Sequence, residues 1–115
     1  MATTVQSRKS KGRRLQQLVV SKILQLFPQL TERDVQSQPM GCPGEDIKLS
    51  EAASKVFPFS VECKNQEKLN IWKALEQSDQ ENRGLPSMVI FKRNRSKVYV
   101  AMELADLLKI LEENQ

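Results

Sequence analysis

Phe59-Ser60-Val61-Glu62-Cys63-Lys64 alternates apolar side chains with polar ones. Because successive side chains of a β-strand point to opposite faces, residues 57–64 are predicted to form a strand. Its apolar members would face a core, whereas Glu62 and Lys64 would project together from the other face. A carboxylate and an ammonium group side by side on one strand are the first indication of chemistry in this chain.

A second carboxylate, Asp46, begins the stretch Asp46-Ile47-Lys48-Leu49-Ser50, which also alternates and predicts a strand. If the two strands pair antiparallel, Asp46 approaches Glu62 from the side. Mg²⁺ prefers oxygen ligands and keeps several waters, so two carboxylates suffice, and the backbone carbonyl of Cys63 could add another oxygen. A metal so held polarises a phosphoryl oxygen and lowers the pKa of a bound water, which Lys64 could position. These residues therefore predict hydrolysis of a phosphodiester.

The remaining sequence supplies helices and further strands around this pair. Apolar residues at helical spacing predict three long helices, and Ser50 is predicted to cap a single turn. The order of elements predicts an α/β fold with a central mixed sheet flanked by helices. The predicted elements are a helix from about residue 13 to Pro28, a loop over 29–44 with a short strand near 34–38, strands over 46–50 and 57–64, a helix over 68–83, a hairpin of 88–92 and 98–101, and a helix over 102–113.

Two apolar patterns predict which helix faces are buried. Leu69, Trp72 and Leu75 are expected to face inward from the helix over 68–83. The last helix carries a leucine stripe that indicates either a core face or a dimer interface, formed by Leu104, Leu107, Leu108 and Leu111.

Positive charge is concentrated in two places. The 115 residues contain 18 Lys and Arg against 14 Asp and Glu, a formal net charge of +4. Residues 1–11 are predicted to form a flexible basic arm, and 12–115 a single domain. Clustered positive charge suits a polyanion such as DNA. The residues expected to bind it, unless the arm only aids solubility, are Arg8, Lys9, Lys11, Arg13 and Arg14. The second cluster is either a further contact or a charged hairpin tip that protects a sheet edge, and it comprises Lys92, Arg93, Arg95 and Lys97.

Composition excludes several other chemistries. The chain has no histidine and only two cysteines, Cys42 and Cys63, so a zinc site is not expected and a histidine-dependent triad is impossible. Two isolated cysteines fit a reducing compartment, which predicts a cytoplasmic protein. No apolar run is long enough to span a membrane, so no membrane partner is expected.

The two strands together resemble the active site of the PD-(D/E)xK nuclease superfamily. The resemblance is carried by Gly44-Glu45-Asp46-Ile47 and Val61-Glu62-Cys63-Lys64, with 15 residues between Asp46 and Glu62, and by the order of elements over most of the chain. The size and the basic N-terminal segment look like archaeal and phage Holliday-junction resolvases. The resemblance implies a restriction-endonuclease-like core and, for a phage-encoded protein, action in the host cytoplasm.

The resemblance also implies roles for individual residues. Asp46 matches the acidic metal ligand, Glu62 the second acid and Lys64 the lysine of the motif. Some branches add a glutamine from the following helix, for which Gln77 is the candidate and Gln80 the alternative. The sequence departs from the pattern in two places. Glu45 replaces the proline before the aspartate, and where resolvases carry an acid on the first helix this chain offers only Gln16 and Gln17, which leaves a fourth ligand open.

These observations predict a DNA endonuclease that depends on Mg²⁺, with Mn²⁺ as a possible substitute. Its expected substrate is branched or duplex DNA, with resolvase-like cleavage of a four-way junction by a symmetric homodimer, because cutting both strands needs two sites. Two alternatives stay open. One is a phage-type nuclease that nicks DNA or processes ends, and the other is a nucleic-acid-binding module without catalysis.

Overall fold

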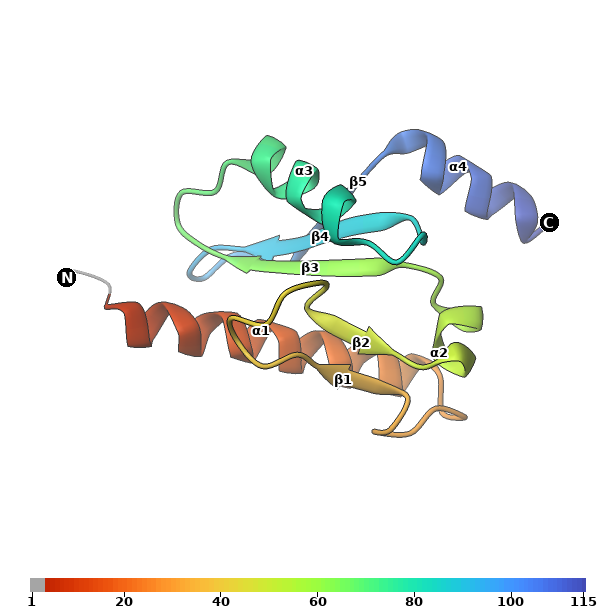
Figure 1. Ribbon diagram of the computed structural model, residues 1–115, viewed down its shortest axis with the longest axis horizontal. Helices are drawn as coiled ribbons and strands as arrows, with labels where there is room; N and C mark the ends of the chain where they lie inside the picture. Colours follow the sequence, from red (N-terminus) through yellow and green to blue (C-terminus); the bar gives the residue numbers. More distant parts are fainter. Residues whose placement is uncertain (1–3) are drawn as a thin grey trace.

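The computed structural model describes residues 4–115, and its centre is a three-stranded sheet (Figure 1). β3 (Ser60–Asn65) and β4 (Ser87–Lys92) are parallel, with Glu62 opposite Val89, and α3 (Ile71–Glu81) connects them. β5 (Tyr99–Met102) pairs antiparallel with β4 and forms the outer edge. The predicted mixed sheet flanked by helices is therefore confirmed.

A second, smaller layer lies below this sheet in Figure 1. β1 (Val35–Ser37) and β2 (Ile47–Leu49) form an antiparallel pair, and α2 (Glu51–Val56) follows directly. Ser50 caps α2 by accepting a hydrogen bond from the Ala53 N–H, as predicted, although α2 is longer than one turn. β2 forms its ladder with β1 and not with β3, so the two strands that carry the carboxylates are not paired along their length.

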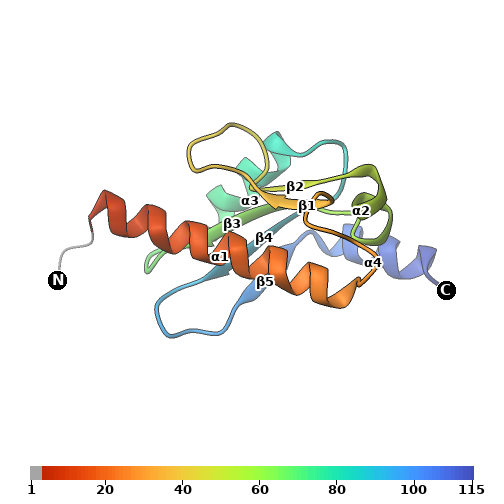
Figure 2. The same ribbon diagram turned by 90° about the horizontal axis from the view of Figure 1, so that it is seen from below.

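α1 (Val5–Leu26) crosses beneath the three-stranded sheet and lies alongside the β1–β2 pair, as Figure 2 shows from below. Leu15, Val19 and Ile23 recur every four residues and are buried. They belong to the same core as the apolar face of the sheet, which includes Val61 and Cys63 of β3. The expectation that these two strand residues face the core is thus confirmed.

The predicted arm over residues 1–11 is wrong for residues 5–11, which form the first turns of α1. Thr4 caps this helix by accepting a hydrogen bond from the Ser7 N–H at 3.0 Å. Apolar periodicity could not reveal these turns because they extend past the core, at the left of Figure 1. Lys, Arg and Gln are good helix formers, so the segment is helical without an apolar stripe. Residues 1–3 of the predicted arm lie outside the described residues.

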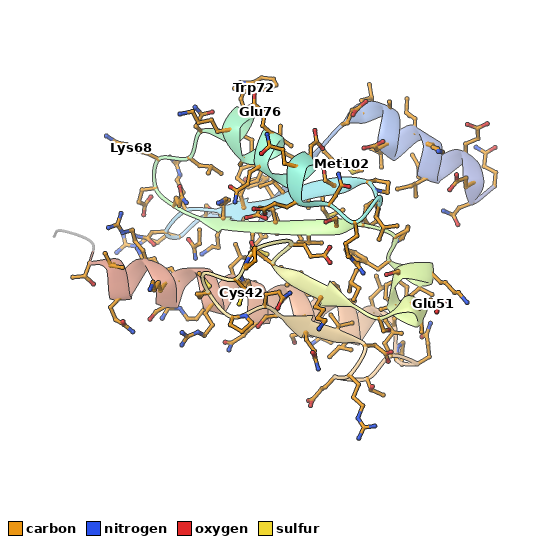
Figure 3. The ribbon with its side chains drawn as sticks, viewed as in Figure 1. Cys42, Glu51, Lys68, Trp72, Glu76 and Met102 are labelled. Carbon is orange, nitrogen blue, oxygen red and sulfur yellow. The ribbon has the colours of Figure 1, made fainter. Side chains whose placement is uncertain are left out.

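α3 differs from its prediction in both start and inward face. Asn70 caps it by accepting a hydrogen bond from the Lys73 N–H, so the helix begins at Ile71. The small residues Ala74 and Ser78 face the sheet and let the helix lie close to it. Trp72 is 75% exposed and points away from the body (Figure 3), which contradicts its predicted inward orientation.

α4 (Leu104–Glu113) stands apart from the core at the right of Figure 1. None of its residues is buried, and all four leucines of its stripe are exposed. Of the two interpretations that the sequence left open, the structure rules out a core face within one chain. Among residues 4–115, no helix has the length and apolar character needed to cross a membrane.

Candidate active site

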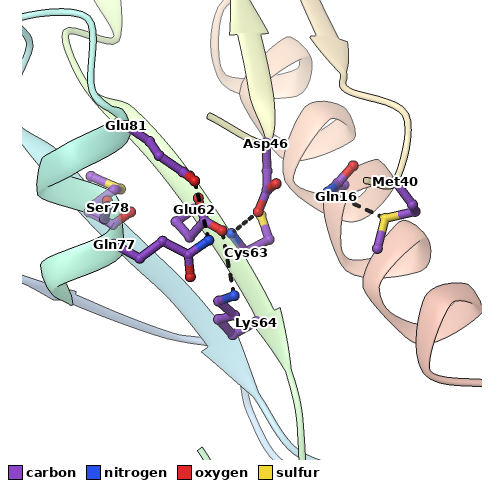
Figure 4. Close-up of polar contacts among 10 residues, drawn as sticks. Gln16, Met40, Asp46, Glu62, Cys63, Lys64, Gln77, Ser78 and Glu81 are labelled. Carbon is purple, nitrogen blue, oxygen red and sulfur yellow. Dashed lines mark hydrogen bonds and ion pairs between the residues drawn. The ribbon is translucent and has the colours of Figure 1, made fainter. Parts of the chain in front are cut away.

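Asp46 forms two hydrogen bonds with the backbone of β3, at the edge of that strand that does not pair with β4. The Asp46 N–H donates to the Val61 carbonyl at 2.9 Å, and the Cys63 N–H donates to Asp46 Oδ2 at 2.7 Å (Figure 4). The N–H and carbonyl of one strand residue point to the same side, so the Cys63 carbonyl also faces this edge. A single residue at the start of β2 therefore reaches β3 although the strands do not pair.

Glu62 and Lys64 share one face of β3, on the side of α3. Lys64 Nζ lies 3.6 Å from Glu62 Oε1, which makes them an ion pair. Glu62 is 4% exposed, and its Oε2 is buried without a hydrogen-bond partner among the described residues. The structure thus brings Asp46, Glu62 and Lys64 together, and it leaves one carboxylate oxygen available for a ligand.

Glu81 is a third acidic residue at this site, and the sequence reasoning missed it. It projects from the last turn of α3 toward Glu62 (Figure 4), and its Oε2 is buried with no partner in the described part of the chain. The Gln77 amide donates to Glu81 Oε1 at 3.4 Å, so Gln77 contacts this carboxylate. Gln80 is exposed. The available signal was the helical spacing, because Glu81 lies four positions after the glutamine that was singled out.

Burial and mutual repulsion perturb the acids of the site. The pKa of Glu62 is raised to about 8, first by burial, then by the negative charge of Asp46 and by the neighbouring carboxyl group of Glu81. Burial also raises the pKa of Asp46, against the opposing effect of the Cys63 N–H and Lys64. Burial raises the pKa of the Cys63 thiol as well, so its side chain is an inert core group. Two neighbouring carboxylates that are shielded from solvent are stabilised when a proton or a cation binds between them.

The site opens into a hollow of about 160 Å³ between β3 and the N-terminal half of α1. Gln16 lines it and is 3% exposed. Its amide nitrogen donates to the Met40 sulfur at 3.7 Å, and its Oε1 is buried without a partner in the described chain. Gln17 is exposed and lines a different hollow. Of the two glutamines, only Gln16 can offer an oxygen to the site.

The donor set fits a hard divalent cation. Within residues 4–115, no group of three or more His, Cys, Asp or Glu side chains is arranged to hold a metal. Mg²⁺ does not need such a group, because it is usually bound through one or two carboxylates and retains waters. For such a cation, Asp46 and Glu62 would provide the carboxylates, and the Cys63 carbonyl and Gln16 Oε1 would provide neutral oxygens. The unpartnered oxygens of Glu62 and Gln16 are what a bound cation would satisfy.

Glu45, where the superfamily has proline, lies outside the hollow and is 6% exposed rather than solvated. It forms an ion pair with Arg83 and accepts a hydrogen bond from Ser60 Oγ at 2.9 Å. Arg83 also donates to the Leu49 carbonyl at 3.3 Å. This cluster ties the start of β2 to β3 and to the loop after α3, and so fixes the backbone that carries Asp46.

α1 distributes the predicted DNA-binding residues over three faces. Arg8 lines the hollow of the acidic site. Lys11 and Arg14 line a second hollow beside the β4–β5 hairpin, and Lys9 and Arg13 line a third on the opposite side of Met40. Folding of this segment as a helix therefore separates charges that are neighbours in sequence.

Comparison with known proteins gives one match. The family model described as "Phage putative PDDEXK endonuclease" matches residues 7–115. No curated protein and no solved structure matches the chain.

Proposed function

This chain belongs to the family of phage PD-(D/E)xK endonucleases, and from that premise we propose that it hydrolyses DNA phosphodiester bonds with a divalent metal ion. The observation that carries the proposal is the pair of carboxylates at the free edge of β3, the partly buried Asp46 and the buried Glu62, with Lys64 beside them. Mg²⁺ is the proposed metal, and Mn²⁺ is expected to replace it because both accept oxygen ligands.

Asp46, Glu62 and the Cys63 carbonyl are the proposed metal ligands, with Gln16 Oε1 as a neutral oxygen from α1. When bound, the metal supplies a Lewis acid for the phosphoryl oxygen. Lys64 is partly exposed, at 21% of its side chain, so its ammonium group reaches the hollow while Glu62 holds it in place. There it orients the attacking water and offsets negative charge on the phosphate in the transition state. Gln77 acts through Glu81 and is a positioning residue.

The proposed substrate is branched DNA, cut symmetrically by a homodimer. One chain offers one acidic site, so two matched cuts need a second copy related by a twofold axis. The surface proposed for this contact is the leucine face of α4, which has no buried residue in the single chain and is continuous along the helix. A nuclease that nicks DNA or processes ends would not need this symmetry.

The test is cleavage of a labelled panel comprising a four-way junction, a nicked duplex, a linear duplex and single strands, each with Mg²⁺, Mn²⁺ or EDTA. We expect metal-dependent cleavage, fastest on the junction, and its loss in Asp46→Asn and Glu62→Gln. Preferred cutting of linear or nicked duplex would support the nicking alternative. Binding of DNA without cleavage under any metal would overturn the nuclease proposal in favour of a binding module.

A further inference from the structure

The two basic clusters of the sequence meet in space across a groove. The hollow beside the β4–β5 hairpin has a volume of about 370 Å³ and lies between that hairpin and α1. Figure 2 shows the hairpin alongside the helix. The polar side chains of its lining are four cations and two amides, namely Lys11, Arg14, Lys92, Arg95, Asn65 and Asn94. Among the described residues, no carboxylate lines it.

These four cations are available to an external anion. None of them takes part in an ion pair among residues 4–115, where the two ion pairs are Lys64 with Glu62 and Arg83 with Glu45. Like charges brought together from two separate elements repel each other, so an anion between them would stabilise the arrangement. Cations spread along a groove rather than focused on one point match a chain of phosphates better than a single ion.

The groove is continuous with the acidic site. Asn65, which directly follows Lys64, lines both hollows, and its amide donates to the Lys11 carbonyl at 3.2 Å. A further hollow, which shares Asn65 and Lys11 with the groove and Asn65 and Arg8 with the acidic site, connects the two. A strand lying in the groove would therefore lead directly into the hollow that holds Glu62 and Lys64.

The hairpin tip is held in position by its own hydrogen bonds. Arg95 adopts a left-handed backbone conformation with φ of 63°, which is uncommon for a residue with a side chain. The Arg93 N–H donates to Ser96 Oγ at 3.0 Å, and the Asn94 N–H donates to Glu67 Oε1 at 3.2 Å. The second hydrogen bond connects the tip to the segment after β3. The side of the groove that carries Arg95 therefore has a defined conformation.

We propose that this groove binds consecutive phosphodiesters of the DNA backbone and aligns the strand with the acidic site. The proposal rests on the proposed function, because it identifies the surface through which the nuclease holds its substrate. It assigns Lys92 and Arg95 to substrate binding, and it selects Lys11 and Arg14 from the basic residues of α1.

The experiment compares two charge-matched double variants of the full chain. Arg14→Gln with Arg95→Gln removes two groove cations. Arg13→Gln with Arg93→Gln removes two other arginines, one from the same helix and one from the same hairpin. Neither of these two residues lines the groove. Binding of labelled duplex is measured by fluorescence anisotropy in EDTA over a range of salt concentrations, so that no cleavage intervenes.

The groove variant should bind more weakly and lose up to about 0.9 in the slope of log K against log salt for each phosphate contact removed. The control variant should retain most of the slope. Equal losses in both variants, or no loss in the groove variant, would overturn the groove proposal. Failure of the proposed function gives a different result, because the parent would then bind DNA with the same slopes but cleave nothing when Mg²⁺ or Mn²⁺ is added.

Discussion

At the residue scale, Lys64 is the side chain whose replacement would distinguish the proposed catalysis from simple binding. Its ammonium group is paired with Glu62 at the mouth of a hollow that is lined by both proposed acidic ligands. Electrostatic stabilisation at such a position acts on charge that develops in the transition state. Its removal is therefore expected to affect the rate of the reaction much more than the affinity for DNA.

Lys64→Met keeps most of the side-chain stem and removes the charge. We expect single-turnover cleavage to fall by a factor on the order of 10²–10³, the effect of losing one transition-state stabiliser. DNA binding at fixed salt should change little, because it depends on many phosphate contacts. Lys48→Met, an exposed lysine of β2, is the matched control and should cleave like the parent. Parent-like cleavage by Lys64→Met would remove this residue from the mechanism, and a parallel loss of binding would make it a phosphate contact instead.

The raised pKa of Glu62 predicts how the stability of the metal-free protein depends on pH. The folded chain keeps a proton on Glu62 up to a pKa of about 8, whereas the unfolded chain loses it near the ordinary value of 4.5. The folded state therefore binds more protons across this interval, and the free energy of unfolding should decrease as pH rises through it. Above about pH 8 this contribution should level off.

Thermal unfolding in EDTA between pH 5 and 9 measures this effect, since each kcal/mol lost lowers Tm by roughly 4 °C in a domain of this size. Glu62→Gln should flatten the pH dependence because its amide does not titrate. Added Mg²⁺ should stabilise the parent more at pH 8 than at pH 6, because the metal competes with the proton. A parent Tm that rises steadily from pH 5 to 8 in EDTA would contradict the assignment.

At the element scale, the acidic site depends on how β2 meets β3. β2 is only three residues long and pairs with β1, so Asp46 is positioned by two backbone contacts and by the Glu45–Arg83 pair one residue before it. This pair connects the start of β2 with the loop between α3 and β4. A change in that loop should therefore alter the position of Asp46, the proposed metal ligand.

Arg83→Met leaves the Glu45 carboxylate buried with the Ser60 hydroxyl as its remaining polar partner. We expect a loss of about 1–3 kcal/mol in the free energy of unfolding, the cost of leaving a buried polar group poorly satisfied. Arg33→Met, at an exposed position, serves as the control. Adding Glu45→Gln should recover part of the loss because the buried charge is removed. Urea unfolding of the four chains checks this, and equal stability of Arg83→Met and the parent would show that the pair contributes nothing.

At the scale of the whole molecule, many of the exposed large apolar side chains belong to α4 and to the strand before it. α4 presents exposed leucines, and the adjoining edge strand β5 has exposed Tyr99 and Val100. Association of two copies through these elements would cover apolar surface that one chain cannot bury. It would also leave the basic groove free, because the groove is lined by residues of α1, β3, the end of β4 and the hairpin tip, and by none of α4.

Leu108→Glu with Leu111→Glu is expected to convert the proposed dimer to a monomer that keeps its helical circular dichroism. Two charges placed on the apolar face cannot be desolvated cheaply at an interface. Leu26→Glu, at another exposed leucine at the end of α1, should leave the dimer intact. Sedimentation equilibrium at micromolar concentration measures the mass. A monomeric parent, or a dimer that persists in the double variant, would rule out this interface.

Sequence alone determined the features that depend on local alternation and periodicity. The strand of Glu62 and Lys64, the apolar half of the first helix, and the mixed sheet follow from side-chain spacing and the order of elements, because burial of one face enforces that spacing. The upstream Asp46 was found because it begins the alternating stretch 46–50, and the resemblance to the superfamily then gave it a role as metal ligand.

Tertiary structure decided what depends on contacts between distant segments. It brought Glu81 from α3 to Glu62, placed Gln16 and not Gln17 in the site, and joined the basic residues of α1 to those of the hairpin. It also turned Trp72 outward and left the leucines of α4 exposed. Periodicity shows that a helix has an apolar face but not whether the chain supplies something to cover it. That depends on how the elements pack, which no local pattern encodes.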